Sequence, residues 1–212
     1  MYDLKLKHEF FQKGGGELSD INEKELLKKC QSGDREAFNI LVETYQRQVI
    51  NLAYGMLSNS EDATDAAQEV FIKVYRNIDN FEGKSSLATW IYRITSNVCK
   101  DFLRKRTRTI QAVSIYEGSE DDDDRPMEIK DSSPTPQEHI EMTETQREVR
   151  KALDELPEEY KSVIVMYDLE GLSYDEISNV LQCPVGTIKS RLNRARKALK
   201  KNLSEKRELF LK

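Results

Sequence analysis

The stretch YDEISNVLQCPVGTIKSRLNRARKAL, from Tyr174 to Leu199, predicts two short helices that meet at a tight turn. Ser173, followed three residues later by Glu176, has the pattern of a capping box at the start of the first helix. Pro184 can occupy the first turn of the second helix, where its missing N–H group would have no intrahelical partner. Apolar residues at steps of three and four then give each helix one inward face. Together these features are typical of a helix-turn-helix.

The second of these helices is strongly basic, although the whole chain has a formal net charge of -5. Between Gln182 and Lys201 lie seven Lys and Arg residues and no acid. In a recognition helix, residues of the N-terminal half can reach base edges in the major groove, and later cations meet phosphates. The free N–H groups at the helix start can also bind a phosphate. A solvated basic face is the alternative, but the capping box, the short turn and the apolar spacing favour DNA.

The composition of the chain favours an all-α protein. Among its 212 residues, 33% are charged and 38% hydrophobic, which fits small helical domains with charged surfaces. No run of alternating apolar and polar residues predicts a strand. No segment is apolar over the length of a signal peptide or a membrane span, so we expect a cytoplasmic protein. The three cysteines lack CxxC spacing and only two histidines are present, so we expect reduced thiols and neither a metal nor a cofactor.

An acidic segment that contains prolines divides the chain. Between Tyr116 and Pro136 lie eight acids, two bases and three of the five prolines, and this composition predicts a linker. The linker has a net charge of 2 − 8 = -6, so the remainder carries -5 + 6 = +1, and the overall acidity does not argue against nucleic acid as a partner. The expected parts are an extension at 1–20, a helical domain at 21–108, the linker at 109–136, a second helical domain at 137–205 and a tail at 206–212.

Amphipathic patterns predict four helices on each side of the linker. The third of them, rich in alanine, has Ser60 as its expected N-cap and includes Tyr75 in its inward stripe. In the fourth, the spacing of Trp90 with its apolar neighbours predicts a core role rather than a stacking wedge. The expected ranges are about 22–31, 38–56, 63–78 and 87–102 before the linker, and about 137–155, 157–171, 173–181 and 184–199 after it.

Four segments resemble the sigma factors of bacterial RNA polymerase, specifically the small extracytoplasmic-function group. They read DATDAAQEVFIKVYRNIDNFEG at 62–83, TWIYRITSNVCKDFLRK at 89–105, LPEEYKSVIVMYDLEGLSYDEIS at 156–178 and PVGTIKSRLNRARKAL at 184–199. The resemblance extends from residue 21 to about residue 203. It implies an all-α fold of two small helical domains, regions two and four of the family, joined by a flexible acidic linker.

The resemblance implies a dissociable sigma subunit that binds core RNA polymerase, recognises both promoter elements of the DNA and directs transcription initiation. It also implies an anti-sigma protein as a partner, and neither enzymatic activity nor a small-molecule substrate. Two rivals are a helix-turn-helix transcription regulator that uses only its C-terminal domain for DNA, and a protein-interaction module without DNA contact. The basic end of the TWIYRITSNV helix argues against both, because neither rival needs a second DNA-reading element.

The resemblance also assigns residues to three surfaces. Those implied to bind the distal promoter element are Val185, Thr187, Lys189, Ser190, Arg191, Asn193, Arg194 and Lys197. Those implied to bind the proximal element are Phe81, Lys84, Ser85, Ser86, Arg93, Asn97, Lys100, Arg104 and Arg106. Within this second set, the pocket for a flipped-out base would be formed by Phe81, Ser85, Ser86 and Asn97. Those implied to dock on the polymerase, on a helix face that could otherwise be merely solvated, are Asp62, Asp65, Gln68 and Glu69.

In the family the linker passes near the active centre of the polymerase and through the path of the emerging RNA. Two interpretations of its charge therefore stay open. The acids could occupy a basic channel as an RNA mimic, through an attraction that salt weakens. They could equally keep a simple tether soluble and extended.

Overall fold

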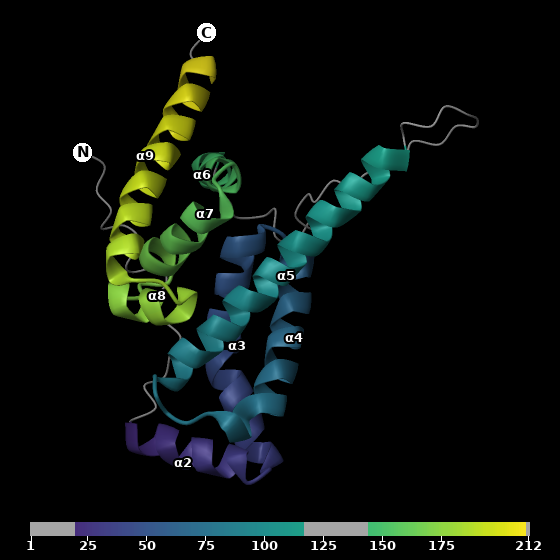
Figure 1. The fold of residues 1–212 in the computed structure, drawn as a ribbon, viewed down its shortest axis with the longest axis vertical. Helices are drawn as coiled ribbons and strands as arrows, with labels where there is room; N and C mark the ends of the chain where they lie inside the picture. The colour runs from purple at the N-terminus through teal and green to yellow at the C-terminus, as the bar shows by residue number, and fades with distance from the viewer. Residues whose placement is uncertain (1–19, 117–143, 211–212) are drawn as a thin grey trace.

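The computed structural model describes residues 20–116 and 144–210, and every regular element within these ranges is a helix (Figure 1). The elements before the gap are α2 (Asp20–Gln31), α3 (Arg35–Leu57), α4 (Ser60–Asn77), the short 3-10 helix η2 (Ile78–Asn80) and α5 (Leu87–Tyr116). The elements after it are α6 (Glu144–Asp154), α7 (Glu158–Ile164), the π-helical turn η4 (Val165–Leu169), α8 (Tyr174–Leu181) and α9 (Val185–Phe210). Among the described residues, no helix is long and apolar enough to cross a membrane.

In the first domain α3, α4 and α5 pack side by side, and α2 lies across one end of them (Figure 1). Their apolar stripes meet in a common core, as the 3.6-residue periodicity predicts. Each fully buried aliphatic side chain contributes about 1.5–3 kcal/mol to folding. The fully buried residues of this core include Leu41, Val49, Leu52, Val70, Val74, Leu87, Ile91 and Val98.

The helices of this domain begin at side-chain caps. Asp34 caps α3, because its carboxylate accepts the N–H of Glu36 at 2.9 Å. For α4 the predicted cap, Ser60, is wrong. Ser60 is already the first helical residue, whereas Asn59 has the extended backbone of an N-cap and accepts the N–H of Asp62 at 2.9 Å.

Helix α5 is longer than the sequence pattern predicts. It continues to Tyr116, into the segment expected to be linker, and its C-terminal part projects beyond α3 and α4 (Figure 1). The apolar stripe ends at Phe102, and the side chains from Arg104 to Arg108 are exposed. Hydrophobic periodicity does not detect the exposed turns from Arg104 to Arg108, because no apolar stripe runs through them.

The second domain contains the predicted helix-turn-helix. The capping box is confirmed, because the Ser173 N–H donates to the Glu176 carboxylate at 2.8 Å and the Glu176 N–H donates to the Ser173 hydroxyl at 3.3 Å. Helix α8 ends at Leu181, its C-cap residue Gln182 has a left-handed φ of 54°, and α9 begins just after Pro184. The buried faces of the two helices are formed by Ile177, Val180, Ile188, Leu192 and Ala195.

Some predicted segments differ from the structure or lie outside the described residues. The helix expected at 157–171 is α-helical only to Ile164 and then widens into the π-helical turn η4. The helix expected from about 137 is described from Glu144, as α6. Helix α9 continues to Phe210, into the expected tail. The proposed extension at 1–19 and the linker from 117 to 136 lie outside the described residues.

The two domains pack against each other. Helix α5 contacts α8, and α3 contacts both η4 and α7. Among the residues near this seam, Glu170 follows η4 and is largely removed from water, and burial raises the pKa of its carboxyl from 4.5 to about 7. On α5, burial and then the nearby carboxylates Glu170 and Glu176 raise the pKa of the Tyr92 phenol.

We expect Glu170→Gln to raise the thermal unfolding midpoint of the whole chain at pH 8. The raised pKa means that the stability associated with the protonated Glu170 is fully present below about pH 4.5 and is lost as pH rises through 7. Because a neutral amide avoids this loss, the gain in the free energy of unfolding should be on the order of 1–3 kcal/mol at pH 8 and near zero at pH 4.5. Calorimetry from pH 4.5 to 8 measures this gain in stability, with the exposed-site variant Glu43→Gln as the control. A difference between Glu170→Gln and the unsubstituted chain that does not vary with pH would contradict the expectation.

Candidate nucleic-acid and polymerase interface

The outer face of α9 is a polar and cationic surface held in place by an apolar inner face. Its inner residues Ile188, Leu192 and Ala195 are buried against α7 and α8. Of the residues assigned to the distal promoter element, those exposed are Lys189, Ser190, Asn193, Arg194 and Lys197. Those half-buried are Val185, Thr187 and Arg191. The first turn of α9, with Ser190 and Arg194, faces a shallow hollow that α7 completes with Glu159 and Tyr160.

Arg191 has an intramolecular role that the sequence did not indicate. Its guanidinium pairs with the Glu159 carboxylate of α7 at 3.0 Å, and its other terminal nitrogen lies 3.9 Å from the Cys183 sulfur. The side chain is therefore partly occupied in holding α9 against α7 and the turn. Lys189 and Arg194 lie on the exposed face of α9 instead.

A cluster of ring and charge contacts, also missed by sequence reasoning, orients α9 relative to η4. Arg196 donates two hydrogen bonds to the Asp168 carboxylate, at 3.2 and 2.5 Å, and this bonding raises the pKa of the guanidinium. The guanidinium lies 5.3 Å from the centroid of the Tyr167 ring, which stacks on Tyr174 at 4.8 Å. Lys189 approaches the Tyr174 ring at 5.5 Å. No local pattern reveals this cluster, because Asp168 and Arg196 are 28 positions apart.

The loop before α5 forms a hollow with aromatic and cationic walls. Phe81 and Trp90 are in contact, with ring centroids 5.1 Å apart. Gln31, at the end of α2, fixes the loop, because its amide donates to the carbonyls of Ile78 at 3.1 Å and Phe81 at 3.2 Å. The residues that line the hollow on the first domain include Phe81, Lys84, Ser85, Thr89, Trp90 and Arg93.

The structure separates two residues that the sequence assigned to the same base pocket. Ser86 caps α5, since its hydroxyl oxygen accepts the N–H of Thr89 at 3.1 Å. Asn97 is exposed and lines a neighbouring hollow together with Asn77 and Ile94. Trp90 lines both hollows. The prediction that Trp90 belongs to the core is confirmed, because only 9% of the residue is exposed, but its edge still forms part of each wall.

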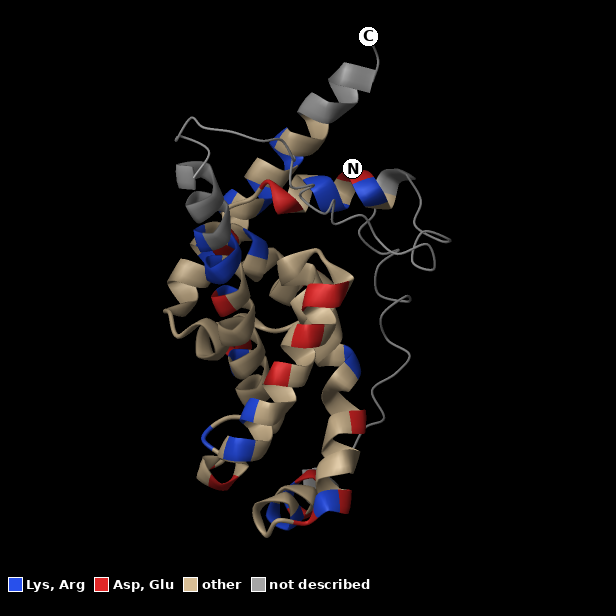
Figure 2. Cartoon of the chain, turned by 90° about the vertical axis from the view of Figure 1, so that its right-hand side faces the viewer, with Lys and Arg blue, Asp and Glu red and all other residues tan. Residues whose placement is uncertain are grey.

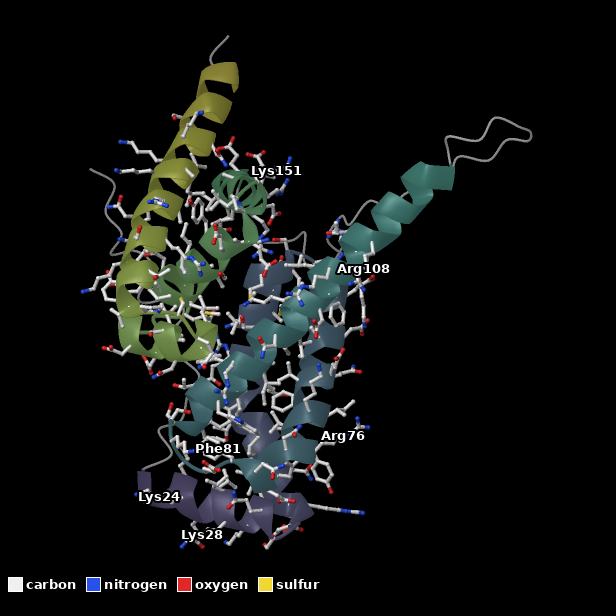
Figure 3. The ribbon with its side chains drawn as sticks, viewed as in Figure 1. Lys24, Lys28, Arg76, Phe81, Arg108 and Lys151 are labelled. Atoms are coloured by element: carbon white, nitrogen blue, oxygen red, sulfur yellow. The ribbon has the colours of Figure 1, made fainter. Side chains whose placement is uncertain are left out.

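Cations continue from this hollow along α5. Arg93 and Lys100 are half-buried, and Arg104 and Arg106 are exposed. Figure 2 shows Lys and Arg positions gathered just before the grey end of α5, and Figure 3 places Phe81 and Arg108 toward opposite ends of the domain. The α5 cations assigned to the proximal element therefore lie between Arg93 and Arg106.

The residues assigned to polymerase docking lie along α4. Asp65 and Gln68 are exposed, and Asp62 and Glu69 are half-buried. Figure 2 shows acids as a red row along the N-terminal half of α4, followed by blue positions toward its C-terminal end. Glu69 pairs with Lys73 at 2.9 Å, one turn further on.

An apolar part of the α4 surface was not predicted. Ile72 is 51% exposed and Tyr75 is 53% exposed, and the Tyr75 ring contacts Phe38 edge to face, with centroids 4.9 Å apart. The assignment of Tyr75 to the inward stripe is therefore wrong. Tyr75 lies three residues after the exposed Ile72, at the edge of the inward stripe of α4. Exposed apolar groups beside acids are typical of a protein-binding surface rather than of a solvated face.

The two helical domains can now be compared with known proteins. The family description "Sigma-70 region 2" matches residues 41–109, and "Sigma-70, region 4" matches residues 146–199. The chain is 35% identical to the RNA polymerase sigma-H factor of Pseudomonas aeruginosa, over 88% of this chain and 96% of the relative. It is 36% identical to the ECF RNA polymerase sigma-E factor of Haemophilus influenzae, over 86% and 96%. The chain belongs to the extracytoplasmic-function (ECF) group of RNA polymerase sigma factors, which direct transcription initiation.

Solved structures agree with this fold. CnrH, in complex with the cytosolic domain of CnrY, superposes with a TM-score of 0.62 at 21% identity and covers 86% of this chain and 97% of that one. The sigma factor RpoE of Bartonella quintana, in complex with the anti-sigma factor NepR, superposes with a TM-score of 0.60 at 26% identity and covers 79% and 96%. The predicted all-α fold of two helical domains is confirmed. The region 2 match also favours the initiation factor over a regulator that uses only its C-terminal domain.

Proposed function

We propose that this chain reads its distal promoter element with the exposed face of α9 and its proximal element with the hollow at Phe81. The observation that carries the proposal is the presence of two cationic surfaces on different domains, one of them walled by aromatic rings. A regulator that only binds duplex DNA needs the first surface and not the second. An initiation factor needs both, because it must also hold a melted strand.

The two surfaces suit different forms of DNA. Lys189, Asn193 and Arg194 extend from the buried anchor of α9 and can hydrogen-bond base edges in the major groove. In the hollow, the edges of Phe81 and Trp90 offer apolar contact to an unstacked base, which offsets the few kcal/mol that unstacking costs. Arg93 and the later cations of α5 hold the phosphates that follow.

We assign the docking of core polymerase to the exposed surface of α4. The acids of its first turns supply charge complementarity, which speeds encounter and sets orientation. Ile72 and Tyr75 supply exposed apolar area that a partner can remove from water. A docking surface with an apolar centre and an acidic edge has the anatomy of a specific protein interface.

Three further assignments follow from the family. An anti-sigma protein is a partner, as it is for the related RpoE structure, which is bound to NepR. The chain acts in the cytoplasm and performs no covalent chemistry itself, since its role is to bind polymerase and DNA. The acidic segment up to residue 136, which we regard as a linker, acts either as an RNA mimic or as a tether.

Run-off transcription on a random promoter library tests this function. With the full chain and core polymerase, we expect enrichment of templates that carry two separated sequence elements, because each domain reads one of them. Core polymerase alone is the control. Enrichment of a single element, or DNA binding by the chain without any run-off product from the holoenzyme, would contradict the proposal and favour the regulator.

A further inference from the structure

An acid of η4 is paired with a cation on the outer side of α9. The Asp168 carboxylate accepts two hydrogen bonds from Arg196, one from Nε at 3.2 Å and one from a terminal nitrogen at 2.5 Å. Because each carboxylate oxygen accepts one of them, the pair has the bidentate geometry that makes such contacts strong. Only 17% of the Asp168 side chain is exposed, against 48% of the Arg196 side chain. The acid is therefore mostly buried, while its partner reaches the surface.

Two tyrosine rings support this pair. The Arg196 guanidinium lies 5.3 Å from the centroid of the Tyr167 ring, and this ring stacks on Tyr174 with planes 14° apart. Tyr174 is the first residue of α8. A cation–π contact thus adds to the two hydrogen bonds. Since η4, α8 and α9 all contribute, the guanidinium is held in one direction by three elements of the second domain.

Arg196 nevertheless lies on the side of α9 that we assign to DNA. It lines a shallow hollow together with Lys189, Asn193, Lys197 and Lys200. These residues follow one another at steps of three and four, so the helix groups them on one side. A duplex that is read by this side brings its phosphates close to these side chains. The guanidinium of Arg196 therefore has two possible partners, the Asp168 carboxylate and a DNA phosphate.

The choice between these partners affects specificity. A cation that binds phosphate adds affinity for any sequence, because phosphates carry no sequence information. A specific complex is held in register by its base contacts, whereas a non-specific complex can slide until its cations meet phosphates well. A released cation therefore stabilises the non-specific complex more. Because specificity is the difference between the two affinities, an acid that engages this cation raises specificity.

We propose that Asp168 is a specificity-determining residue of the distal-element surface, which acts by engaging Arg196 in place of a DNA phosphate. Asp168 is a positioning residue, since it acts through Arg196 and does not itself contact DNA. It limits sequence-independent binding and leaves discrimination to the base-edge contacts of α9. This role rests on the proposed assignment of α9 to the distal element.

The test is Asp168→Asn in the holoenzyme formed from the full chain and core polymerase. The measurement is the affinity, over a salt series, for a duplex that carries the distal element found by promoter selection and for a duplex with this element scrambled. For the scrambled duplex, we expect the slope of log affinity against log salt to steepen by about 0.9, the value of one added phosphate contact. Its affinity should therefore gain about threefold more than that of the unsubstituted chain between 200 and 50 mM salt. The ratio of matched to scrambled affinity should fall.

Two further variants separate release of the cation from loss of structure. Asp168→Asn combined with Arg196→Gln keeps the net charge of the original pair and places two amides that can hydrogen-bond to each other. Both the slope and the affinity for the scrambled duplex should return to those of the unsubstituted chain. Asp168→Glu retains the carboxylate and should leave the slope unchanged.

Glu158→Gln is the matched control. Glu158 is an exposed acid in the first turn of α7, so this variant removes one negative charge from the same domain while the pair of Asp168 with Arg196 stays intact. The slope for the scrambled duplex should not change. Circular dichroism verifies the helices in every variant.

Three results would overturn this role for Asp168. One is a slope in Asp168→Asn equal to that in Glu158→Gln. Another is a loss of discrimination that arises only from weaker binding of the matched duplex and persists in the double variant, since Asp168 would then only stabilise the domain. The third is a slope that becomes shallower by about 0.9 in Arg196→Gln alone, because Arg196 would then already bind phosphate in spite of its pair. If the unsubstituted holoenzyme binds both duplexes equally, the assignment of α9 has failed instead.

Discussion

A chain that carries Lys189→Ala together with Arg194→Ala is expected to lose most of its preference for its distal promoter element. Each base-edge contact contributes about 1–3 kcal/mol of discrimination, so two of them amount to about 2–6 kcal/mol, or roughly 30-fold to more than 1,000-fold in relative affinity. Both side chains are exposed on α9, so the fold should survive. Competition binding of the holoenzyme to matched and mismatched duplexes measures the preference.

Lys200→Ala is the control for this variant. Lys200 is exposed further along α9, where a contact with phosphate is expected, so its removal should weaken binding to every sequence alike and reduce the salt dependence. If removal of Lys189, Ser190, Asn193 and Arg194 together left promoter choice unaltered, the helix would not be the reading element.

The second large effect is expected at the polymerase surface. Asp65→Lys together with Glu69→Lys should lower the affinity for core polymerase at least tenfold, because it reverses the charge of one exposed and one half-buried acid and places like charges at positions 69 and 73. Single rim charges contribute little, but a reversal of both introduces repulsion as well as removing attraction. A pull-down with core polymerase at low and moderate salt measures it, and circular dichroism verifies the helices.

A matched control exists on α2 and α3. Glu25 and Lys29 form an ion pair of the same spacing on α2, at 3.0 Å, and Glu43 is an exposed acid on α3. Glu25→Lys with Glu43→Lys therefore changes the net charge and removes a helical ion pair in the same way. Equal loss of polymerase binding in the two double variants would indicate a general effect of charge and remove α4 from the interface.

Much of the local structure could be predicted because its causes are local. Apolar residues at steps of three and four predict each helix from its own segment, and the capping box at Ser173 and Glu176 depends on residues three positions apart. The errors arose where local signals were ambiguous. Asn59 and Ser60 are both good caps, and only the backbone conformation distinguishes them. Tyr75 lies at the edge of its helix stripe, where the sequence cannot tell which face will be covered.

In the candidate site, too, some features follow from local sequence and others depend on packing. Residues on a single helix face, such as Lys189 and Arg194, could be assigned together because the helix itself groups them. The pocket around Phe81 could be assigned only in part. Ser86 and Asn97 lie close to it in sequence, yet one caps α5 and the other faces a neighbouring hollow. The direction in which a loop side chain points depends on the packing around the loop and not on the spacing of its residues.

The sequence by itself determined the helical character of the residues that the structure describes and the basic outer surface of α9, because periodicity, caps and charge are properties of contiguous residues. Only the tertiary structure decided that Asp168 orients Arg196, that Trp90 borders two hollows and that η4 packs on Gly55. Each of these depends on a contact between residues that are distant in sequence. Such contacts form only when the helices pack their apolar faces against one another.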